Sequence, residues 1–495
     1  MEFIQITNIA RWALWVYNRI IMRAKTFRGG IHPKEYKELS NQCPVTPAFP
    51  KTKTVSIPVT MGGAPNQPVV KVGDEVAKGQ VIATGDGFMN CPVHSSISGK
   101  VKKIQSCLVT GNGMAPCIVI EADDGGREAL LPVLNPFECS KEDALKRIKE
   151  AGIVGMGGAS FPAHVKLNPP AGKVIDYVLI NAAECEPYLT CDERTMVEAP
   201  SKVIDGLAIV LHIVNGGTAK TGNAKGIIVL EDNKAYILPA LEKEIKAAGY
   251  EGSMSVCLVK TKYPQGAEKF IVSAATGREI PSAKLPADAG CVICNVGSVC
   301  AISDAFRLGM PLVERSLTIS GGAVVQPVNI RVPVGTIVSD LMPEVFKLKG
   351  EVTEGGTGEA VKIISGGPMM GFAMISADFP VAKGTSGVTF LTEKETFLEE
   401  ESQCISCGSC VAKCAMRLSP ALIVRELKAG NLDKAKSFGL MDCIECGCCA
   451  FVCPAKVNLI QRIRLGKGLV RQKMAEEIAK AAAKAAAEKA AEGGK

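Results

Sequence analysis

The stretches CISCGSCVAKC at residues 404–414 and CIECGCCAFVCP at residues 443–454 decide the fold of the C-terminal part of this chain. Each stretch spaces four cysteines as Cys-x2-Cys-x2-Cys-x3-Cys, and a proline follows the second. Nine of the 20 cysteines in this 495-residue chain lie between positions 404 and 453. In a long chain such runs indicate metal ligands in a reducing compartment, hence the cytoplasm, and argue against a secreted, disulfide-linked protein.

The regular spacing predicts two [4Fe–4S] clusters. It is the spacing of bacterial ferredoxins, in which the fourth cysteine of each run ligates the cluster of the other run. Thiolates suit the softness of iron, whereas structural zinc sites usually combine two Cys-x2-4-Cys pairs, so zinc is disfavoured. Cys448 falls out of register and is expected to ligate neither cluster. The predicted ligands are Cys404, Cys407, Cys410 and Cys453 for the first cluster, and Cys443, Cys446, Cys449 and Cys414 for the second.

Composition excludes several other classes of protein. Hydrophobic residues make up 47% of the chain and charged residues 22%, which is ordinary for a globular protein. The formal net charge is +7, but the surplus of Lys and Arg lies at the two ends, and no nucleic-acid-binding motif is present. We therefore predict no nucleic-acid partner. No uncharged apolar run reaches the roughly 18 residues of a transmembrane helix, so none is predicted.

Residues 1–26 are the one candidate for membrane contact. Apolar residues recur there at helical spacing, with Trp12 and Trp15 nearby and three arginines interrupting the run. This pattern predicts an amphipathic helix that lies in a membrane interface. A helix packed on the body of the protein itself explains the pattern equally well.

The chain is predicted to be a multidomain protein of the α/β plus β class. Residues 70–87, VKVGDEVAKGQVIATGDG, resemble the barrel-sandwich fold of lipoyl and biotinyl domains, without the carrier lysine. Strands alternating with helices then predict a layered α/β domain. Short strands follow, with the glycine loop ISGGPMMG at residues 364–371, and look like a β-grasp domain of the soluble-ligand-binding type. The predicted boundaries are 1–26 for the N-terminal helix, 27–138 for the barrel-sandwich domain, 139–314 for the α/β domain, 315–391 for the β-grasp domain, 392–470 for the helical two-cluster ferredoxin domain and 471–495 for an Ala/Lys/Glu-rich helical tail.

Two segments of the α/β domain have the composition of a ligand site. Residues 153–167, IVGMGGASFPAHVKL, form a glycine-rich loop whose N–H groups can contact a phosphate, with Lys166 adding a positive charge. The loop fails as a Rossmann fingerprint because Ser160 replaces the third glycine, and a structural turn would explain it as well. Residues 181–196, NAAECEPYLTCDERTM, gather acidic side chains after a predicted strand, where α/β proteins bind ligands. A solvated loop is the alternative.

Taken together, these segments resemble a known flavoprotein family. GMGGASFP with NAAECEP is similar to the flavin and NADH site of the flavoprotein subunit of respiratory NADH dehydrogenase. With FRGGIHP at residues 27–33, the barrel segment, the β-grasp part and the paired cysteine runs, the chain is identified as a member of the family of C subunits of the Rnf ion-translocating complex. The resemblance covers roughly residues 25–460.

The resemblance implies which residues bind FMN and NAD(H). The site would combine the glycine loop, the acidic segment, KYPQGAEKF at residues 262–270 and CNVGSV at residues 294–299. Gly155, Gly157, Gly158 and Lys166 would bind the phosphate and ribityl chain of FMN, Asn181 and Glu184 would lie near the flavin, Phe161 and Glu186 would face the nicotinamide nucleotide, and Tyr263, Gly266, Glu268 and Asn295 would complete the site.

The resemblance also implies a function. The chain would exchange hydride between NAD(H) and FMN and single electrons with its two [4Fe–4S] clusters, without a catalytic side chain. It would be a peripheral subunit on the cytoplasmic face of a membrane complex that transfers electrons between ferredoxin and NAD+, with ferredoxin as an indirect partner of this chain. Partner subunits would couple the electron transfer to Na+ or H+ movement. The alternatives are a soluble cobalamin reductase of the same architecture and a cluster-bearing docking subunit without flavin.

Overall fold

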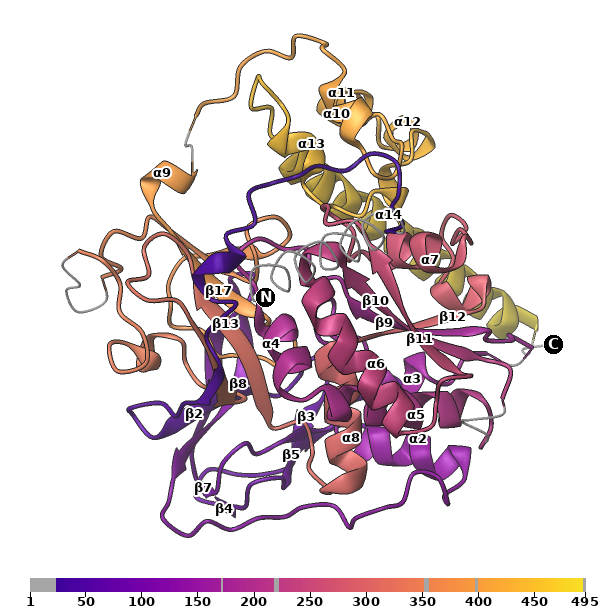
Figure 1. Ribbon diagram of the computed structural model, residues 1–495. Coiled ribbons are helices and arrows are strands. Elements are labelled where there is room, and N and C mark those ends of the chain that lie inside the picture. Colours follow the sequence, from indigo (N-terminus) through magenta and orange to yellow (C-terminus); the bar gives the residue numbers. More distant parts are fainter. Residues whose placement is uncertain (1–23, 171, 218–221, 351–355, 397–398, 493–495) are drawn as a thin grey trace, which may run out of the picture. The chain divides into compact units, whose positions relative to one another are not determined.

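The computed structural model describes the chain from residue 24 to residue 492 with four internal gaps (Figure 1). The described residues are 24–170, 172–217, 222–350, 356–396 and 399–492, with side chains described as far as residue 481. They separate into two compact units. The larger unit holds residues 24–26 and 32–396, and the smaller unit holds residues 27–31 together with the residues from 399 onward.

A parallel four-stranded sheet forms the centre of the α/β region of the larger unit (Figure 1). Its strand order is β11-β10-β9-β12, and all neighbouring strands run parallel. Since β9 comes first in the chain and later strands lie on both sides of it, the order reverses between β9 and β12, a switch point at which open α/β sheets bind ligands. The strands are β9 (Tyr177–Ala182), β10 (Lys225–Glu231), β11 (Met254–Val259) and β12 (Cys291–Asn295).

Helices cover both faces of this sheet, so its strands are apolar on both sides. Val178 and Ile180 of β9 belong to one core with α2, α5, α6 and α8, whereas Leu179 belongs to another core with α7. This alternation follows from the two-residue period of a strand. The helices are α2 (Lys141–Glu150), α3 (Ala163–Lys166), α4 (Cys191–Glu198), α5 (Pro200–Val214), α6 (Leu238–Ala247), α7 (Glu268–Thr276) and α8 (Val296–Arg307), with the short turns η2 (Asp232–Ile237) and η3 (Pro286–Ala289).

Local sequence signals account for the ends of α2. The Ser140 hydroxyl caps the helix by accepting the N–H of Asp143 at 3.0 Å, a role in which serine is common. Gly152 follows the last turn with a φ of 63°, a conformation that suits glycine. The chain then enters the glycine loop, so the end of α2 sets the position from which this loop starts.

The N-terminal part of the larger unit folds into two antiparallel sheets over a shared apolar core. The sheets have the orders β2-β8-β7-β4 and β3-β5-β6. Side chains such as Ile57, Ile82 and Ile118, all fully buried, fill the core. The strands are β2 (Thr54–Pro58), β3 (Gln67–Pro68), β4 (Glu75–Val76), β5 (Val81–Thr84), β6 (Val93–His94), β7 (Gly99–Val109) and β8 (Gly113–Ala122).

The larger unit also contains a six-stranded sheet of order β1-β14-β13-β17-β15-β16. β1 comes from the N-terminal part of the chain and pairs in parallel with β14. The glycine loop at residues 366–371 joins β15 to β16, which pair antiparallel. The elements are η1 (Lys37–Leu39), β1 (Val45–Pro47), β13 (Glu314–Ser320), β14 (Val328–Pro333), η4 (Ser339–Leu341), β15 (Lys362–Ser365), β16 (Phe372–Met374), β17 (Gly387–Leu391) and α9 (Glu393–Thr396).

The smaller unit is helical and has its own core. Ile423, Leu440 and Ile463 are fully buried in it, beside several of the cysteines. Residues 27–31 join this unit, where the N–H of Gly30 donates to the carbonyl of Lys413 at 3.0 Å. The elements are α10 (Ser409–Lys413), α11 (Pro420–Lys428), α12 (Leu432–Ser437), η5 (Leu440–Asp442), α13 (Cys448–Phe451) and α14 (Leu459–Glu492).

The predicted class, α/β plus β with a helical cysteine-bearing part, is confirmed. The amphipathic helix predicted for residues 1–26 lies almost entirely outside the described residues. Among the helices that the structure describes, none is both long and apolar enough to span a bilayer. Helix α14 continues without a break past residue 470, after which the Ala/Lys/Glu-rich tail is predicted to begin.

Candidate functional site

The glycine-rich loop leaves backbone open to a ligand. It is closed at its base by a hydrogen bond from the Gly155 N–H to the Phe161 carbonyl at 2.8 Å. Gly157 has a φ of +95°, which disfavours any other residue, and no atom lies within 4 Å of the place where a Cβ on Gly158 would stand. The Phe161 side chain is 39% exposed. The loop can therefore receive a group that needs close approach to backbone N–H groups.

Lys166 and Glu268, both predicted site residues, are brought together. The loop is shorter than the predicted residues 153–167, because residues 163–166 form α3. Lys166 ends α3, and its Nζ lies 2.9 Å from Oε1 of Glu268 at the start of α7. Both side chains are partly exposed, so the ion pair itself adds little stability. Its main effect is to fix the position of a cation beside the glycine loop.

Asn181, near the end of β9, binds the loop that contains Gly266. Its Nδ2 donates to the Gly266 carbonyl at 2.7 Å, and its Oδ1 accepts the N–H of Ala183 at 3.2 Å. A Cβ on Gly266 would lie 2.3 Å from the Ala183 carbonyl oxygen, so only glycine allows this approach. The acidic segment and the KYPQGAEKF segment thus meet at the carboxyl end of the central strand.

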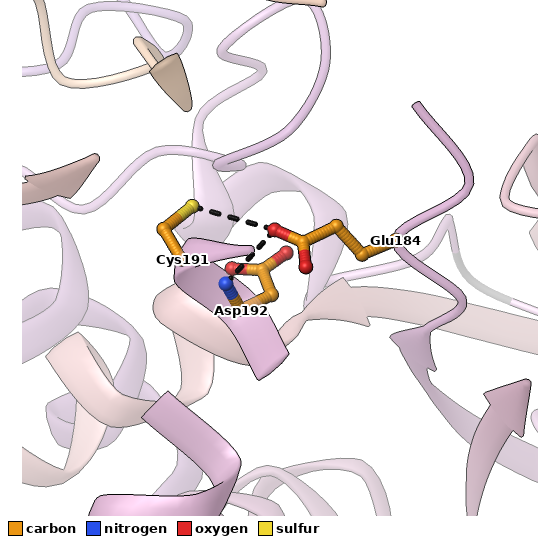
Figure 2. A group of neighbouring side chains, drawn as sticks. All are labelled: Glu184, Cys191 and Asp192. Carbon is orange, nitrogen blue, oxygen red and sulfur yellow. Dashed lines mark hydrogen bonds between the residues drawn. The ribbon is translucent and has the colours of Figure 1, made fainter. Parts of the chain in front are cut away.

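Figure 2 shows Glu184, Cys191 and Asp192 with their side chains turned toward one another. Glu184 accepts the N–H groups of Asp192 at 2.9 Å and Glu193 at 3.3 Å, and the Cys191 thiol lies 3.5 Å from its Oε1. The three side chains could reach a single metal ion. However, a buried guanidinium, that of Arg315, acts electrostatically on Cys191 and Asp192, and its positive charge opposes a cation there.

Asn295 continues this network across the switch point. Its Nδ2 donates to Oδ2 of Asp192 at 2.6 Å, and its Oδ1 caps α8 by accepting the N–H of Gly297 at 2.8 Å. Burial, and next the neighbouring charge of Glu184, raise the pKa of Asp192 to about 6. The network joins β9, α4 and β12 and so holds the strand ends in a fixed arrangement.

Glu186 is held by groups from three distant parts of the chain. Its carboxylate accepts the N–H of Met369 at 3.0 Å, the N–H of Met370 at 2.8 Å and the hydroxyl of Tyr263. Burial raises the pKa of Glu186 to about 7, although these hydrogen bonds act in the opposite direction. The Lys37 ammonium binds the carbonyl of Glu186 at 3.0 Å.

Two buried polar side chains that are not among the predicted site residues lie beside them. Arg315 of β13 is 3% exposed and donates to the Thr385 carbonyl at 2.6 Å and to Sδ of Met156 at 3.2 Å, while its Nη2 has no partner among the described residues. Gln265 is fully buried, and neither atom of its amide has a partner there. Buried polar groups normally have partners, so both fit a site completed by a ligand or water. Gln265 could have been selected from the sequence, because it lies between the predicted site residues Tyr263 and Gly266. Nothing in the sequence marks Arg315 as a site residue.

The two cysteine runs of the smaller unit adopt the same backbone turn. Three residues with a positive φ in the first run each have a counterpart with nearly the same φ 39 positions later in the second run. The paired values are 55° and 59°, 74° and 79°, and 56° and 50°. These turns bring backbone N–H groups to sulfur, with the N–H of Leu418 3.3 Å from Sγ of Cys414 and that of Glu445 3.4 Å from Sγ of Cys443. Such N–H···S contacts tune iron–sulfur clusters. The matched residues are Ser406 and Glu445, Gly408 and Gly447, and Arg417 and Lys456.

The structure brings one predicted ligand set around a cavity. Cys414, Cys443, Cys446 and Cys449 all line it, with apolar side chains completing the wall. Cys448, predicted to be a bystander, is fully buried and also reaches this wall. The other set is more open: Cys404 and Cys407 are exposed, whereas Cys410 and Cys453 are half-buried.

Comparisons with known proteins agree with this arrangement. Family models match for the Nuo51 FMN-binding domain over residues 148–304, the RnfC barrel sandwich hybrid domain over residues 25–125 and the 4Fe-4S dicluster domain over residues 396–454. The C subunit of the proton-translocating ferredoxin:NAD(+) oxidoreductase complex of Clostridium ljungdahlii is 44% identical, over 89% of this chain and 93% of that protein. The chain belongs to the family of Rnf complex C subunits.

Two further relatives carry names of the same kind. The C subunit of the Na(+)-translocating ferredoxin:NAD(+) oxidoreductase complex of Acetobacterium woodii is 41% identical, over 89% of this chain and 96% of its own. The C subunit of the ion-translocating oxidoreductase complex of Rhodobacter capsulatus is 36% identical, over 92% of this chain and 85% of its own. The family named from the sequence is thereby confirmed.

The residues present fit the cofactors that the Rnf family implies. FMN is a polar ligand with a phosphate, and three features near the strand switch point suit it. These are the open space at Gly158, the positive charge of Lys166, and the polar atoms of Gln265 and Arg315 that have no partner among the described residues. For [4Fe–4S] clusters, the donor set is thiol sulfur alone around an apolar cavity. The FMN-binding and dicluster family models support the same two cofactors.

Proposed function

We propose that this chain is the electron-transfer subunit of a membrane-bound ferredoxin:NAD+ oxidoreductase complex that moves Na+ or H+. The proposal depends on one observation: the same chain contains a site suited to flavin, at the point where the strand order reverses, and two cysteine runs with the same backbone turns. Flavin, when bound, exchanges a hydride with NAD(H) and single electrons with iron–sulfur clusters. The relatives that are named for such complexes support the assignment.

Within the site, the side chains bind and orient the ligands and perform no chemistry themselves. Lys166 and the open loop glycines suit the phosphate and ribityl chain of FMN, and Asn181 with Glu184 fix the loops beside the flavin ring. The Glu186 carboxylate can accept a further hydrogen bond, from a donor group of the nicotinamide nucleotide. The full proposed set is Gly155, Gly157, Gly158, Phe161, Lys166, Asn181, Glu184, Glu186, Tyr263, Gly266, Glu268 and Asn295, to which we add Gln265 and Arg315.

The cluster ligands and the cellular location complete the proposal. Cys404, Cys407, Cys410 and Cys453 would hold one cluster, and Cys414, Cys443, Cys446 and Cys449 the other. The subunit would be peripheral, on the cytoplasmic face of the membrane, where the nucleotide and ferredoxin are found. A cluster-bearing subunit without flavin fits less well, because it would leave the amide of Gln265 and Nη2 of Arg315 without a role. A soluble reductase would give the same cofactor content, so membrane fractionation separates it from this proposal.

Charge reversal at Lys166 tests the flavin site. We expect Lys166→Glu to lose bound FMN and NADH-dependent bleaching of the clusters, because the new carboxylate repels both Glu268 and a phosphate. Iron content should stay unchanged. The matched control is Lys173→Glu, which also reverses an ion-paired lysine, 2.7 Å from Asp288, but precedes β9 and so lies toward the amino ends of the strands. Full FMN content in Lys166→Glu would contradict the assignment.

A further inference from the structure

The glycine loop at residues 366–371 contacts the site without belonging to the flavin-binding region. It comes from the six-stranded sheet, about 180 positions from Glu186 in the sequence. Met369 donates its N–H to Oε2 of Glu186, and Met370 donates its N–H to Oε1, so the loop holds both oxygens at once. Two such bonds fix the carboxylate plane as well as its position.

The hydrogen bonds of Glu186 leave room for a ligand. A carboxylate offers about four lone-pair sites, and Met369, Met370 and Tyr263 occupy three of them. The residue remains partly exposed, so one more donor can reach it. The charged group that acts on it is the Lys37 ammonium, from η1. A hydroxyl or amide of a nucleotide is a donor of the required kind.

The loop approaches Glu186 so closely that one of its glycines is required. A Cβ on Gly367 would lie 2.3 Å from Oε2 of Glu186 and 2.7 Å from its Cβ. The loop is closed on itself by the Gly371 N–H, which donates to the Gly367 carbonyl at 2.9 Å. Gly367 does not have a positive φ, so its backbone conformation is open to alanine. The strain in an alanine variant would come from the contact between the new Cβ and Glu186.

We propose that the loop Gly366–Gly371 is a positioning element of the nicotinamide-nucleotide site, and that its two N–H groups aim the Glu186 carboxylate at a donor group of the nucleotide. This inference rests on the proposed function, in which Glu186 faces NAD(H). It assigns part of nucleotide recognition to the six-stranded sheet, whereas the flavin would be bound by the α/β region. Met369 and Met370 act through their backbone N–H groups.

A double-mutant cycle on the FMN-loaded protein tests the proposal. We expect Gly367→Ala and Glu186→Gln each to raise KM for NADH roughly tenfold in ferricyanide reduction, with kcat nearly unchanged, since each weakens hydrogen bonds to one charged group. Because both act through one carboxylate, the double variant should be no worse than Glu186→Gln alone. Gly252→Ala, where a Cβ meets no atom within 4 Å, is the control and should match the unmodified protein.

The possible outcomes distinguish a failure of the loop proposal from a failure of the proposed function. If Gly367→Ala binds NADH like the unmodified protein, or if the two effects add, the loop inference is overturned and the proposed function stands. If the unmodified protein binds neither FMN nor NADH, both fail. Should Gly367→Ala not fold, hydrogen exchange in the unmodified holoprotein decides: NADH should slow exchange of the Met369 and Met370 amides, and unchanged exchange at saturating NADH would overturn the inference.

Discussion

At the scale of single residues, the site is defined by carboxyl groups, buried or partly buried, whose hydrogen bonds oppose the effect of burial on the pKa. Glu186 shows this most clearly, because burial raises its pKa while three donors lower it. Asp192 behaves similarly, with burial and Glu184 acting against the amide of Asn295. Such opposed effects leave carboxyl groups that titrate near neutral pH, as is common at functional sites.

Glu186 should make the stability of the larger unit depend on pH. Its folded pKa of about 7 lies above the roughly 4.3 of an unfolded glutamate, so its contribution to stability is complete below that lower value and is lost as pH rises through 7. Relative to Glu186→Gln, which cannot ionise, the unmodified protein should lose on the order of 3 kcal/mol between about pH 5 and pH 8. Chemical unfolding of both proteins across this range measures the difference. A constant difference would show that the carboxyl is not buried in this way.

At the scale of elements, the site depends on how closely α5 and α8 pack on the parallel sheet. Gly206 of α5 faces the backbone of α8, and a Cβ there would lie 2.1 Å from the carbonyl oxygen of Val299. Asn295 caps the same α8 and belongs to the network at the switch point. The packing of two helices therefore sets the position of a residue in the site.

We expect Gly206→Ala to loosen this packing and to lower the temperature at which FMN is released. Alanine gains about 1 kcal/mol of helix propensity over glycine, but overpacking against a rigid backbone oxygen costs about 1–3 kcal/mol, and here the contact is severe. Flavin fluorescence on heating measures the release. In contrast, Gly468→Ala in α14 meets no atom within 4 Å and should leave the release temperature unchanged. An unchanged temperature for Gly206→Ala would contradict the packing described here.

At the scale of the whole molecule, the two cofactor types belong to two units with separate cores. The proposed flavin residues all lie in the larger unit, and the predicted cluster ligands all lie in the smaller one. Since the core of the smaller unit includes several of the cysteines, metal binding and folding should be coupled there.

We therefore expect Cys446→Ser to lose half of the iron and to speed hydrogen exchange in the smaller unit, while FMN content and exchange in the parallel sheet stay unchanged. Cys448→Ser, at a buried neighbour in the same cavity wall, should retain all the iron. Iron analysis, flavin absorbance and hydrogen exchange give the three measurements. Full iron content in Cys446→Ser would remove this residue from the ligand set.

Features that depend on neighbours along the chain could be predicted from the order of residues alone. Four cysteines within eleven positions fall on one loop and the short helix that follows it, and the same positive φ values recur in both runs because each run contains the same local chemistry. Likewise, the cap at Ser140 follows from local hydrogen bonding, and strand β9 (Tyr177–Ala182) follows from a continuous apolar run that is buried on both faces. Their physical causes act over a few residues, which is why a linear pattern was enough.

Contacts between distant groups, in contrast, became visible only in the folded chain. The pairing of Asn181 with Gly266 and the hydrogen bonds from Met369 and Met370 to Glu186 join segments about 80 to 180 positions apart, and the burial of the Arg315 guanidinium has no local signal. Nothing local encodes these contacts, since they depend on the order of strands in two sheets and on close approach at particular glycines. Chain topology, and not residue type, brings a loop of one sheet to the site of another.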